Sequence, residues 1–417
     1  MFISNAPSLL KGRDAPLPNS LVRNALADYE DQKAKTNEEE YTPPVDSNTS
    51  DVDAELRAIA DQLDVCIKIV GCGGGGSNTI NRCVDGGIDG AQLCALNTDA
   101  KHLLTVRAPR KILIGRTLTR GLGAGAIPQV GEQAARENDM EIRDFLNGAN
   151  IVFITAGMGG GTGTGSAHYV ARIAKEQFQA LALSVVTLPF KAEGALRMEN
   201  ALMGLNRLRM LCDTTIVIPN DKLLELVPKL PVDAAFKVAD EVLMQTLKGL
   251  TEIITKPGLV NLDYSDIQTV MKEGGVAFVG IGEADENEDD RVSVAVNEAL
   301  SSPLLGEIDL KDAKGALIRV VGGPDMTVSE AEKAADIVSS KMSDRARIIW
   351  GCSVEPEQHG TIKVLLIITG ANSKYLVGSG YEDISQPVDG MEMPPQTQYP
   401  QNGGYAQDDD TGIDFVR

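Results

Sequence analysis

Short apolar runs alternate along the chain with longer segments whose apolar residues recur every three or four positions. The apolar runs predict buried strands at 66–70, 92–96, 111–114, 151–156, 182–188 and 215–219. The helical periodicity between them predicts helices at 132–145, 167–177 and 195–211. Because short apolar strands separated by helices are typical of a parallel doubly wound sheet, we expect a Rossmann-like α/β fold whose ligand binds at the carboxyl ends of the strands.

A long helical segment at 232–254 follows, and its apolar residues predict that it is largely buried where two domains join. Beyond it, the pattern predicts a smaller α+β unit with a mixed sheet. Its expected helices are 264–272, 291–300 and 329–342, and its expected strands are 276–281, 316–321, 347–352 and 361–369. The predicted divisions of the chain are 1–52, 53–231, 232–257, 258–375 and 376–417.

Both ends of the chain are rich in polar residues, with proline and acidic residues among them, which predicts that they are largely disordered. The N-terminal extension covers 1–52, and the C-terminal linker begins near 376. Apolar residues return at the very end, in Gly412–Arg417. This pattern indicates a short docking peptide on a flexible tether, although a frayed end without function has the same composition.

Charge and cysteine usage exclude several classes of protein. The net charge is −20, with 59 acidic and 39 basic residues and no concentrated basic patch, so nucleic acid and anionic membranes would be repelled. No apolar run reaches the ~20 residues of a membrane span. The six cysteines form no CxxC pair and the three histidines share no ligand-like spacing, so we expect reduced thiols, a cytoplasmic protein and no protein-held metal.

Two glycine-rich turns follow strands and indicate a phosphate site. The turn at 159–165, GGGTGTG, lies between an expected strand and an expected helix, and the turn at 71–76 follows the first core strand. Glycines let backbone N–H groups approach an anion, and a helix start attracts it. Neither turn ends in the lysine of a Walker A loop. Taken alone, the turn at 71–76 fits the NAD fingerprint. Two such turns suit a triphosphate held from two sides, and a third, at 120–125, could close over it.

Three further groups of residues carry possible chemistry. Glu193 and Arg197 are four apart, so they form either a surface ion pair or contacts to ribose and phosphate. Asp240 could accept the two neighbouring donors of guanine with Phe236 stacked on the base, although Phe236 would equally suit a core. The segment 261–266, NLDYSD, has carboxylates at a helix start, which either cap the helix or orient a water or a cation.

Taken together, these motifs resemble the tubulin/FtsZ GTPase family, and within it the archaeal-type cell-division FtsZ proteins. The resemblance covers about 53–375, in the family's order. Its motifs are GGGTGTG at 159–165, ALNTDA at 95–100, RGLGAG at 120–125, PFKAEG at 189–194, NDKL at 220–223 and NLDYSD at 261–266. The chain departs from the family at His168-Tyr169, where a proline is usual inside the helix start, and we expect little effect.

The resemblance implies a GTP site and assigns residues to it. The residues implied to contact the nucleotide are Gly74, Gly75, Gly76, Ser77, Asn78, Asn97, Asp99, Gly163, Thr164, Gly165, Glu193, Arg197, Phe236 and Asp240. Among them, Asn97 and Asp99 are expected near the phosphates or near Mg²⁺ carried by the nucleotide. Asp263 and Asp266, with Asn261, are the implied catalytic acids and amide, which in this family enter the site of the next subunit. The cofactors would be GTP and GDP.

The resemblance further implies a head-to-tail homopolymer that forms the division ring at mid-cell. GTP would be hydrolysed at the contact between subunits, and hydrolysis would weaken that contact. Gly412–Arg417 would bind a membrane-attached adaptor, and a second FtsZ paralogue is a possible partner; direct membrane insertion is not expected. A GTP-gated scaffold filament with slow turnover is the alternative, which the presence of all three catalytic residues opposes. An NAD-dependent oxidoreductase is a remote alternative.

Overall fold

The computed structural model describes residues 65–226, 232–256, 264–272, 274–285, 290–306, 308–355 and 358–371. All of them belong to the compact unit that starts at Val65. The expectations for 1–52 and for 376–417 therefore lie outside the described residues. Within the described ranges the strands form one ten-stranded sheet in the order β3-β2-β1-β4-β5-β6-β7-β10-β8-β9.

The first six strands form the parallel part of this sheet. They are β1 (Ile67–Cys72), β2 (Ala91–Asn97), β3 (Arg110–Leu113), β4 (Ile151–Gly157), β5 (Leu181–Leu188) and β6 (Thr214–Pro219). Every neighbouring pair among them is parallel, with Ile67 opposite Ala91 on one side and opposite Ile151 on the other. The residues of β1, β5 and β6 are buried throughout. The predicted parallel α/β fold is thus confirmed, and its strands are apolar along their whole length because helices cover both faces.

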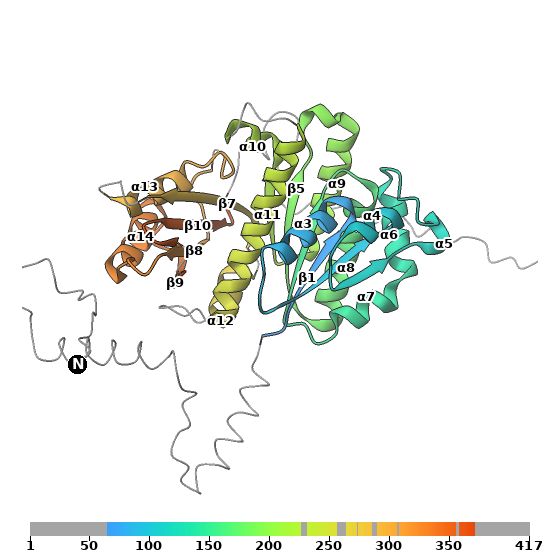
Figure 1. Ribbon diagram of the computed structural model, residues 1–417, viewed down its shortest axis with the longest axis horizontal. Helices are drawn as coiled ribbons and strands as arrows, with labels where there is room; N and C mark the ends of the chain where they lie inside the picture. Colours follow the sequence, from blue (N-terminus) through green and yellow to red (C-terminus); the bar gives the residue numbers. More distant parts are fainter. Residues whose placement is uncertain are drawn as a thin grey trace, which may run out of the picture. The chain divides into compact units, whose positions relative to one another are not determined.

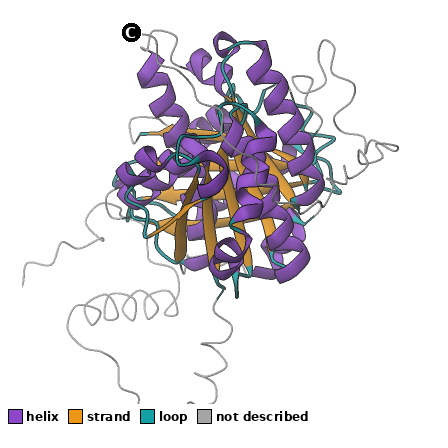
Figure 2. Ribbon diagram, turned by 90° about the vertical axis from the view of Figure 1, so that its right-hand side faces the viewer, coloured by secondary structure: helices purple, strands orange, loops and turns teal. Residues whose placement is uncertain are grey.

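Two hydrophobic cores, one on each face of the sheet, hold these helices in place. One face carries α6 (Pro128–Glu137), α7 (Asp139–Leu146), α8 (Gly161–Phe178) and α9 (Ala195–Leu211). The other carries α3 (Gly73–Asp85), α4 (Ala100–Thr105), α10 (Asn220–Leu226) and α11 (Val232–Thr255). Two short turns of helix, α5 (Arg116–Thr119) and η1 (Lys191–Glu193), complete this part. Figures 1 and 2 show the strands enclosed by helices.

The helix predicted at 132–145 is two helices in the structure. Asn138 separates α6 from α7, with φ −108° and ψ 31°. Its Oδ1 accepts a hydrogen bond from the Gly115 N–H at 2.9 Å, and its Nδ2 donates to Glu141 at 3.0 Å. A contact to a distant loop therefore interrupts a segment whose local periodicity is helical throughout. The glycine-rich segment at 71–76, expected to be a turn, is mostly helical, because α3 begins at Gly73, directly after β1.

The C-terminal part is built on a mixed arrangement of strands, as predicted. Its elements are α12 (Tyr264–Met271), β7 (Gly275–Ala284), α13 (Arg291–Leu300), β8 (Gly315–Gly322), α14 (Val328–Lys341), β9 (Arg347–Val354) and β10 (Ile362–Thr369). Strand β10 is antiparallel to β7 and to β8, whereas β8 and β9 are parallel. Strand β7 pairs with β6 in parallel over three residue pairs. The sheet therefore continues from one part into the other, which the sequence did not predict.

Helix α11 crosses the sheet beside this join, with its apolar side buried. Figure 1 shows it between the first part of the unit and strands β7–β10. Near its end, Glu252 is buried and forms an ion pair with Arg319 of β8, which is buried as well. Lys256 also donates to Glu252 at 2.7 Å. Since a buried charge needs a partner, the pair with Arg319 fixes α11 against β8. Among the described residues, no helix is long and apolar enough to cross a membrane.

Candidate functional site

A cavity of about 510 Å³ opens at the carboxyl ends of the parallel strands. It lies where the fold places ligands in open α/β sheets. Residues from the ends of β2, β4 and β5, and from the starts of α3, α8 and α10, contribute to its wall. The lining residues are Gly74, Gly75, Asn78, Asn97, Thr98, Asp99, His102, Gly123, Ala124, Gly125, Ala126, Gly157, Met158, Gly160, Gly161, Thr162, Gly163, Thr187, Pro189, Glu193, Arg197, Asn220, Phe236, Ala239 and Asp240.

Two helix starts, those of α3 and α8, meet at this cavity. Neither has an acidic residue in its first turn. The unpaired N–H groups and the positive dipole ends of both helices are therefore available to one anion. A Cβ atom added at Gly74 or at Gly160 would meet no atom within 4 Å, so the backbone is open to a ligand at both positions.

Of the predicted phosphate-contacting residues on these helices, Gly74, Gly75, Asn78 and Gly163 line the cavity. The structure places Gly76, Ser77, Thr164 and Gly165 behind its wall. A Cβ at Gly76 would lie 2.4 Å from the Thr155 carbonyl oxygen, and one at Gly165 would lie 2.0 Å from the Pro128 carbonyl oxygen. The Thr164 hydroxyl accepts a hydrogen bond from the Gly159 N–H at 2.8 Å. The geometry thus gives Gly76, Thr164 and Gly165 packing or bonding partners within the protein.

A cluster of polar side chains stands beside the two helix starts. Asn97 and Asp99 both line the cavity, as does His102. Asp99 caps α4 by accepting a hydrogen bond from the His102 N–H at 3.0 Å. Thr98 and Thr162 share a hydrogen bond of 2.6 Å that joins the end of β2 to the start of α8. The predictions included Asn97 and Asp99 but not His102, which lies close to them only because of the helix turn that Asp99 begins.

The third glycine-rich segment, at 120–125, reaches the cavity through Gly123, Ala124 and Gly125. Backbone hydrogen bonds hold it against the end of β2: Ala100 N–H donates to Gly121 at 3.1 Å, and Gly123 N–H donates to Thr98 at 3.3 Å. A loop fixed in this way can present backbone amides to a ligand.

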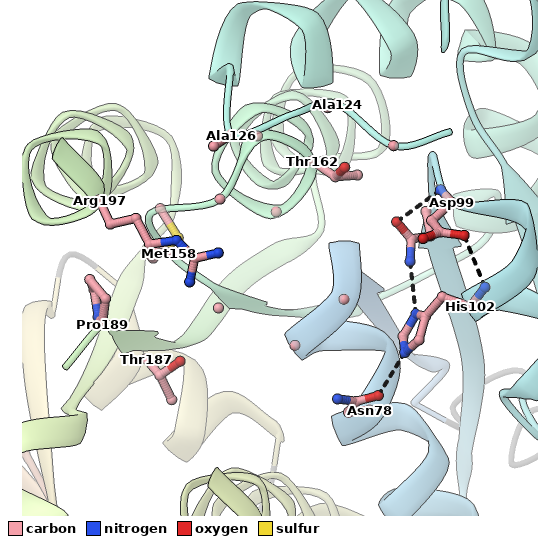
Figure 3. A pocket seen from close by; sticks show the side chains of 18 of the residues that line it. Asn78, Asp99, His102, Ala124, Ala126, Met158, Thr162, Thr187, Pro189 and Arg197 are labelled. Atoms are coloured by element: carbon pink, nitrogen blue, oxygen red, sulfur yellow. Dashed lines mark hydrogen bonds between the residues drawn. The ribbon is translucent and has the colours of Figure 1, made fainter. Parts of the chain in front are cut away.

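Glu193 and Arg197 line the cavity and also form an ion pair with each other. Glu193 accepts a further hydrogen bond from the Phe190 N–H at 2.9 Å, which fixes the carboxylate. Figure 3 shows the Arg197 side chain extending beside Met158. The surface ion pair and the ligand contact expected from the sequence are therefore compatible, since the pair exists and lies at the cavity.

At the α11 side of the cavity lie Phe236 and Asp240. The Phe236 ring is 41% exposed and packs edge-on against Phe190, with the ring centroids 5.0 Å apart. Burial raises the pKa of Asp240 to about 6, against the opposing effect of Arg82, whose Nε is 3.8 Å away. Asn220 also lines the cavity, and its buried Oδ1 has no hydrogen-bond partner among the residues that the structure describes. A flat ring, a carboxylate and an amide are suited to hold a planar base with polar edges.

Of the predicted catalytic residues, the structure describes Asp266, which does not line the cavity. Asp266 is an exposed residue near the start of α12, and Asn261 and Asp263 lie outside the described residues. The hydroxyl of Tyr264, on the same helix, donates to the Asn150 carbonyl at 3.3 Å. Asn150 immediately precedes β4, so α12 lies at the amino end of the strand whose carboxyl end opens on the cavity. Within the described ranges, no three His, Cys, Asp or Glu side chains are grouped to hold a metal ion.

Comparisons with known proteins agree with this geometry. Residues 66–228 match the model of the tubulin/FtsZ family GTPase domain, and residues 275–372 match that of the FtsZ family C-terminal domain. The chain is 51% identical over 363 residues to cell division protein FtsZ 1 of Archaeoglobus fulgidus, covering 87% of this chain and 96% of that protein. It is 52% identical over 339 residues to FtsZ 1 of Pyrococcus furiosus, covering 81% of this chain and 90% of the relative.

A solved structure is similar over most of the described residues as well. An empty FtsZ dimer from M. jannaschii superposes with a TM-score of 0.73 at 48% identity, covering 80% of this chain and 99% of that chain. The two family models cover successive parts of one chain, in the order in which the parallel and mixed parts of the sheet follow each other. The chain therefore belongs to the tubulin/FtsZ family and carries that family's GTPase domain, followed by the FtsZ C-terminal domain.

Proposed function

We propose that the cavity binds GTP, with the triphosphate at the starts of α3 and α8. The observation that carries this proposal is the meeting of two helix N-termini, neither with an acidic first turn, in one cavity. Glu193 would contact the ribose and Arg197 the nucleotide, while Phe236 stacks on guanine and Asp240 accepts its two donors. The carboxylate of Asp240 favours guanine over adenine, because adenine lacks the matching pair of donors.

The residues at the phosphate end are compatible with Mg²⁺ that arrives with the nucleotide. Asn97 and Asp99 line the cavity and offer oxygen atoms of the kind that Mg²⁺ prefers. When bound, the ion would neutralise part of the phosphate charge.

Hydrolysis in this proposal takes place between two subunits. Strand β4 has seven residues and therefore spans roughly 20 Å, with the cavity at one end and the contact to α12 at the other. Asp266 is thus poorly placed to serve the nucleotide of its own subunit. Stacking subunits head to tail would bring Asp263, Asp266 and Asn261 of one subunit to the cavity of the next. The dimeric M. jannaschii relative supports such self-association.

The chain's residues would then divide the reaction between them. Asp263 and Asp266 orient a water and accept its proton as its oxygen attacks the γ-phosphorus. The bond between the γ-phosphorus and the β–γ bridging oxygen breaks, leaving GDP and inorganic phosphate. The backbone amides at the starts of α3 and α8 stabilise the charge that develops on the phosphate oxygens.

At the level of the cell, this polymer would form the division ring at mid-cell, in keeping with the name cell division protein given to the relatives. Gly412–Arg417, outside the described residues, would bind a membrane-attached adaptor. A second FtsZ paralogue would be a further partner.

A mixing experiment tests the shared active site. Asp266→Ala keeps the cavity and loses the acid, whereas Asp240→Ala keeps the acid and loses guanine recognition. Each variant alone should hydrolyse GTP slowly. An equal mixture should recover part of the wild-type turnover, because some junctions combine an intact cavity with an intact acid. The matched control mixes Asp266→Ala with the Asp266→Ala/Asp240→Ala double variant, where no junction has both.

Other outcomes would decide against parts of the proposal. Wild-type turnover per molecule that stays flat with protein concentration would show that one subunit holds a complete site. GTP-driven polymer without turnover would instead support the scaffold filament. Failure of GTP to raise the melting temperature of the wild-type protein would contradict the binding site itself.

A further inference from the structure

His102, on α4, stands between two asparagines at the phosphate end of the cavity. Its Nδ1 lies 3.0 Å from Asn97 Nδ2, and its Nε2 lies 2.9 Å from Asn78 Oδ1. Figure 3 shows a dashed line from the His102 ring to the Asn78 side chain on α3. The imidazole therefore bridges the two elements that bracket this end of the cavity.

The direction of each hydrogen bond follows from the amide of Asn97. Its Oδ1 already accepts from the Thr98 N–H at 2.9 Å and from the Asp99 N–H at 3.3 Å. The Nδ2 end therefore faces the histidine, and an amide NH₂ group can only donate. Nδ1 of His102 must be the acceptor, which leaves the proton of the neutral ring on Nε2. That N–H then donates to Oδ1 of Asn78.

The same chain of bonds determines which end of Asn78 faces the cavity. With its oxygen held by His102, Asn78 presents its Nδ2 end to a ligand, as the orientation drawn in Figure 3 shows. An NH₂ group attracts phosphate oxygens, whereas an amide oxygen in its place would repel them. We propose that His102, itself oriented by Asn97, is a positioning residue, which fixes the amide orientation of Asn78 so that Asn78 donates to the phosphates of the nucleotide.

The backbone of His102 is held independently of its ring. Its N–H donates to Asp99 at 3.0 Å, and its carbonyl accepts from the Thr105 hydroxyl at 2.7 Å. Replacing the imidazole should therefore leave α4 and the Asn97 amide in place and release only the Asn78 amide. This separation makes the proposal testable by substitution.

The proposal rests on the GTP site proposed above, and a double-mutant cycle tests it. The dissociation constant for GTP is measured for His102→Leu, His102→Gln, Asn78→Ala and the His102→Leu/Asn78→Ala double variant. His102→Leu should weaken GTP binding about ten- to hundred-fold, the value of a charge-assisted hydrogen bond. His102→Gln, which keeps one acceptor and one donor, should recover most of that loss. The double variant should bind no more weakly than Asn78→Ala alone, because His102 acts through Asn78.

Controls separate the possible failures. His359 is exposed on the C-terminal part, and His359→Leu should bind GTP as the wild type does. If His102→Leu melts below the wild type, His102→Met, which also lacks hydrogen-bonding nitrogens, replaces it in the cycle. Wild-type affinity in the Leu or Met variant, or multiplicative effects of the His102 and Asn78 changes, would overturn the positioning role. Absence of GTP binding by the wild type would instead overturn the proposed function.

Discussion

The two helices that start at the cavity have similar glycine-rich sequences but different surroundings. Helix α3 packs against β1 and β4, and its Gly76 touches the Thr155 carbonyl. Helix α8 packs against another helix, α6, where Gly131, Gly161 and Gly165 let two backbones meet. Each start nonetheless has one glycine open to the cavity, Gly74 in α3 and Gly160 directly before α8.

A glycine-rich phosphate turn thus serves two purposes at once. Gly74 and Gly160 leave room for a ligand. Gly76 and Gly165 have no space for a side chain, and they bring each helix close enough to its neighbour for the turn to reach the cavity. The helices also differ in the contacts that hold them. Arg82 of α3 faces Asp240 of α11, whereas His168 of α8 faces Glu132 of α6.

The largest loss of stability is expected when a glycine without space for a Cβ atom, such as Gly165, is replaced by alanine. In Gly165→Ala, the new Cβ would lie 2.0 Å from the Pro128 carbonyl and 2.6 Å from the Glu132 nitrogen, both backbone atoms of α6. We expect a loss of about 3 kcal/mol or more in the free energy of unfolding, measured by urea denaturation. The matched variant Gly160→Ala has free space and should unfold like the wild type. Equal stability of the two variants would mean that α6 moves aside readily.

The stability that Asp240 contributes where α11 meets α3 should fall as the pH rises, because burial disfavours its ionised form more than Arg82 favours it. The pKa of Asp240 is raised from 3.8 to about 6, so the folded state binds more protons than the unfolded state between these values. Stability linked to this group is lost as the pH rises through 6, and its ionised form costs about 2–3 kcal/mol at pH 7. Asp240→Asn should thus unfold at higher denaturant concentration at pH 7 and lose this advantage near pH 4. An advantage that is independent of pH would point to another cause.

The contact of α8 with α6 should have the opposite dependence. Hydrogen bonds from His168 and then Arg136 lower the pKa of Glu132 from 4.5 to about 2. A lowered carboxyl pKa contributes stability above 4.5 that is lost as the pH falls through 2. With screening by solvent, we expect Glu132→Gln to cost about 2 kcal/mol at pH 7 and little near pH 2. Unfolding curves recorded beside those of Asp240→Asn would test whether the two signs differ.

The smallest expected effect concerns the bond between the two sides of the phosphate end. Thr162→Val removes the hydroxyl that pairs with Thr98 at 2.6 Å while keeping the shape of the side chain. Leaving the buried Thr98 hydroxyl without this partner should cost about 1 kcal/mol in thermal unfolding. Thr98→Val together with Thr162→Val should cost less than twice that amount, since neither hydroxyl then remains unpaired.

Much of the fold followed from local patterns, because strands buried on both faces must be apolar along their length. The glycine turn at 159–165 likewise indicated a phosphate site through its residue types and its place between a strand and a helix. What the sequence could not supply depends on distant contacts. Asn138 breaks a helical segment because the Gly115 amide needs an acceptor, and β6 meets β7 across the whole length of α11.

The site shows the same limit. The spacing of Asp99 and His102 could have predicted that His102 lies beside Asn97 and Asp99, since a capped helix turn brings residues i and i+3 together. Asn78, however, contacts His102 from α3, and the spacing of residues along the chain does not predict a contact between separate helices. Gly76 and Gly165 also pack against the backbone of β4 and of α6, and glycine-rich composition alone does not reveal those neighbours.

The join between β6 and β7 has a mechanical consequence. Three residue pairs cross it, whereas eight pairs join β7 to β10, β10 to β8 and β8 to β9. A force pulling the strands apart would therefore separate β6 from β7 first. Helix α11, through its Glu252–Arg319 ion pair, would oppose that separation. The parallel and mixed parts of the sheet are thus each more extensively hydrogen-bonded than the join between them, and α11 is the helix that connects them across that join.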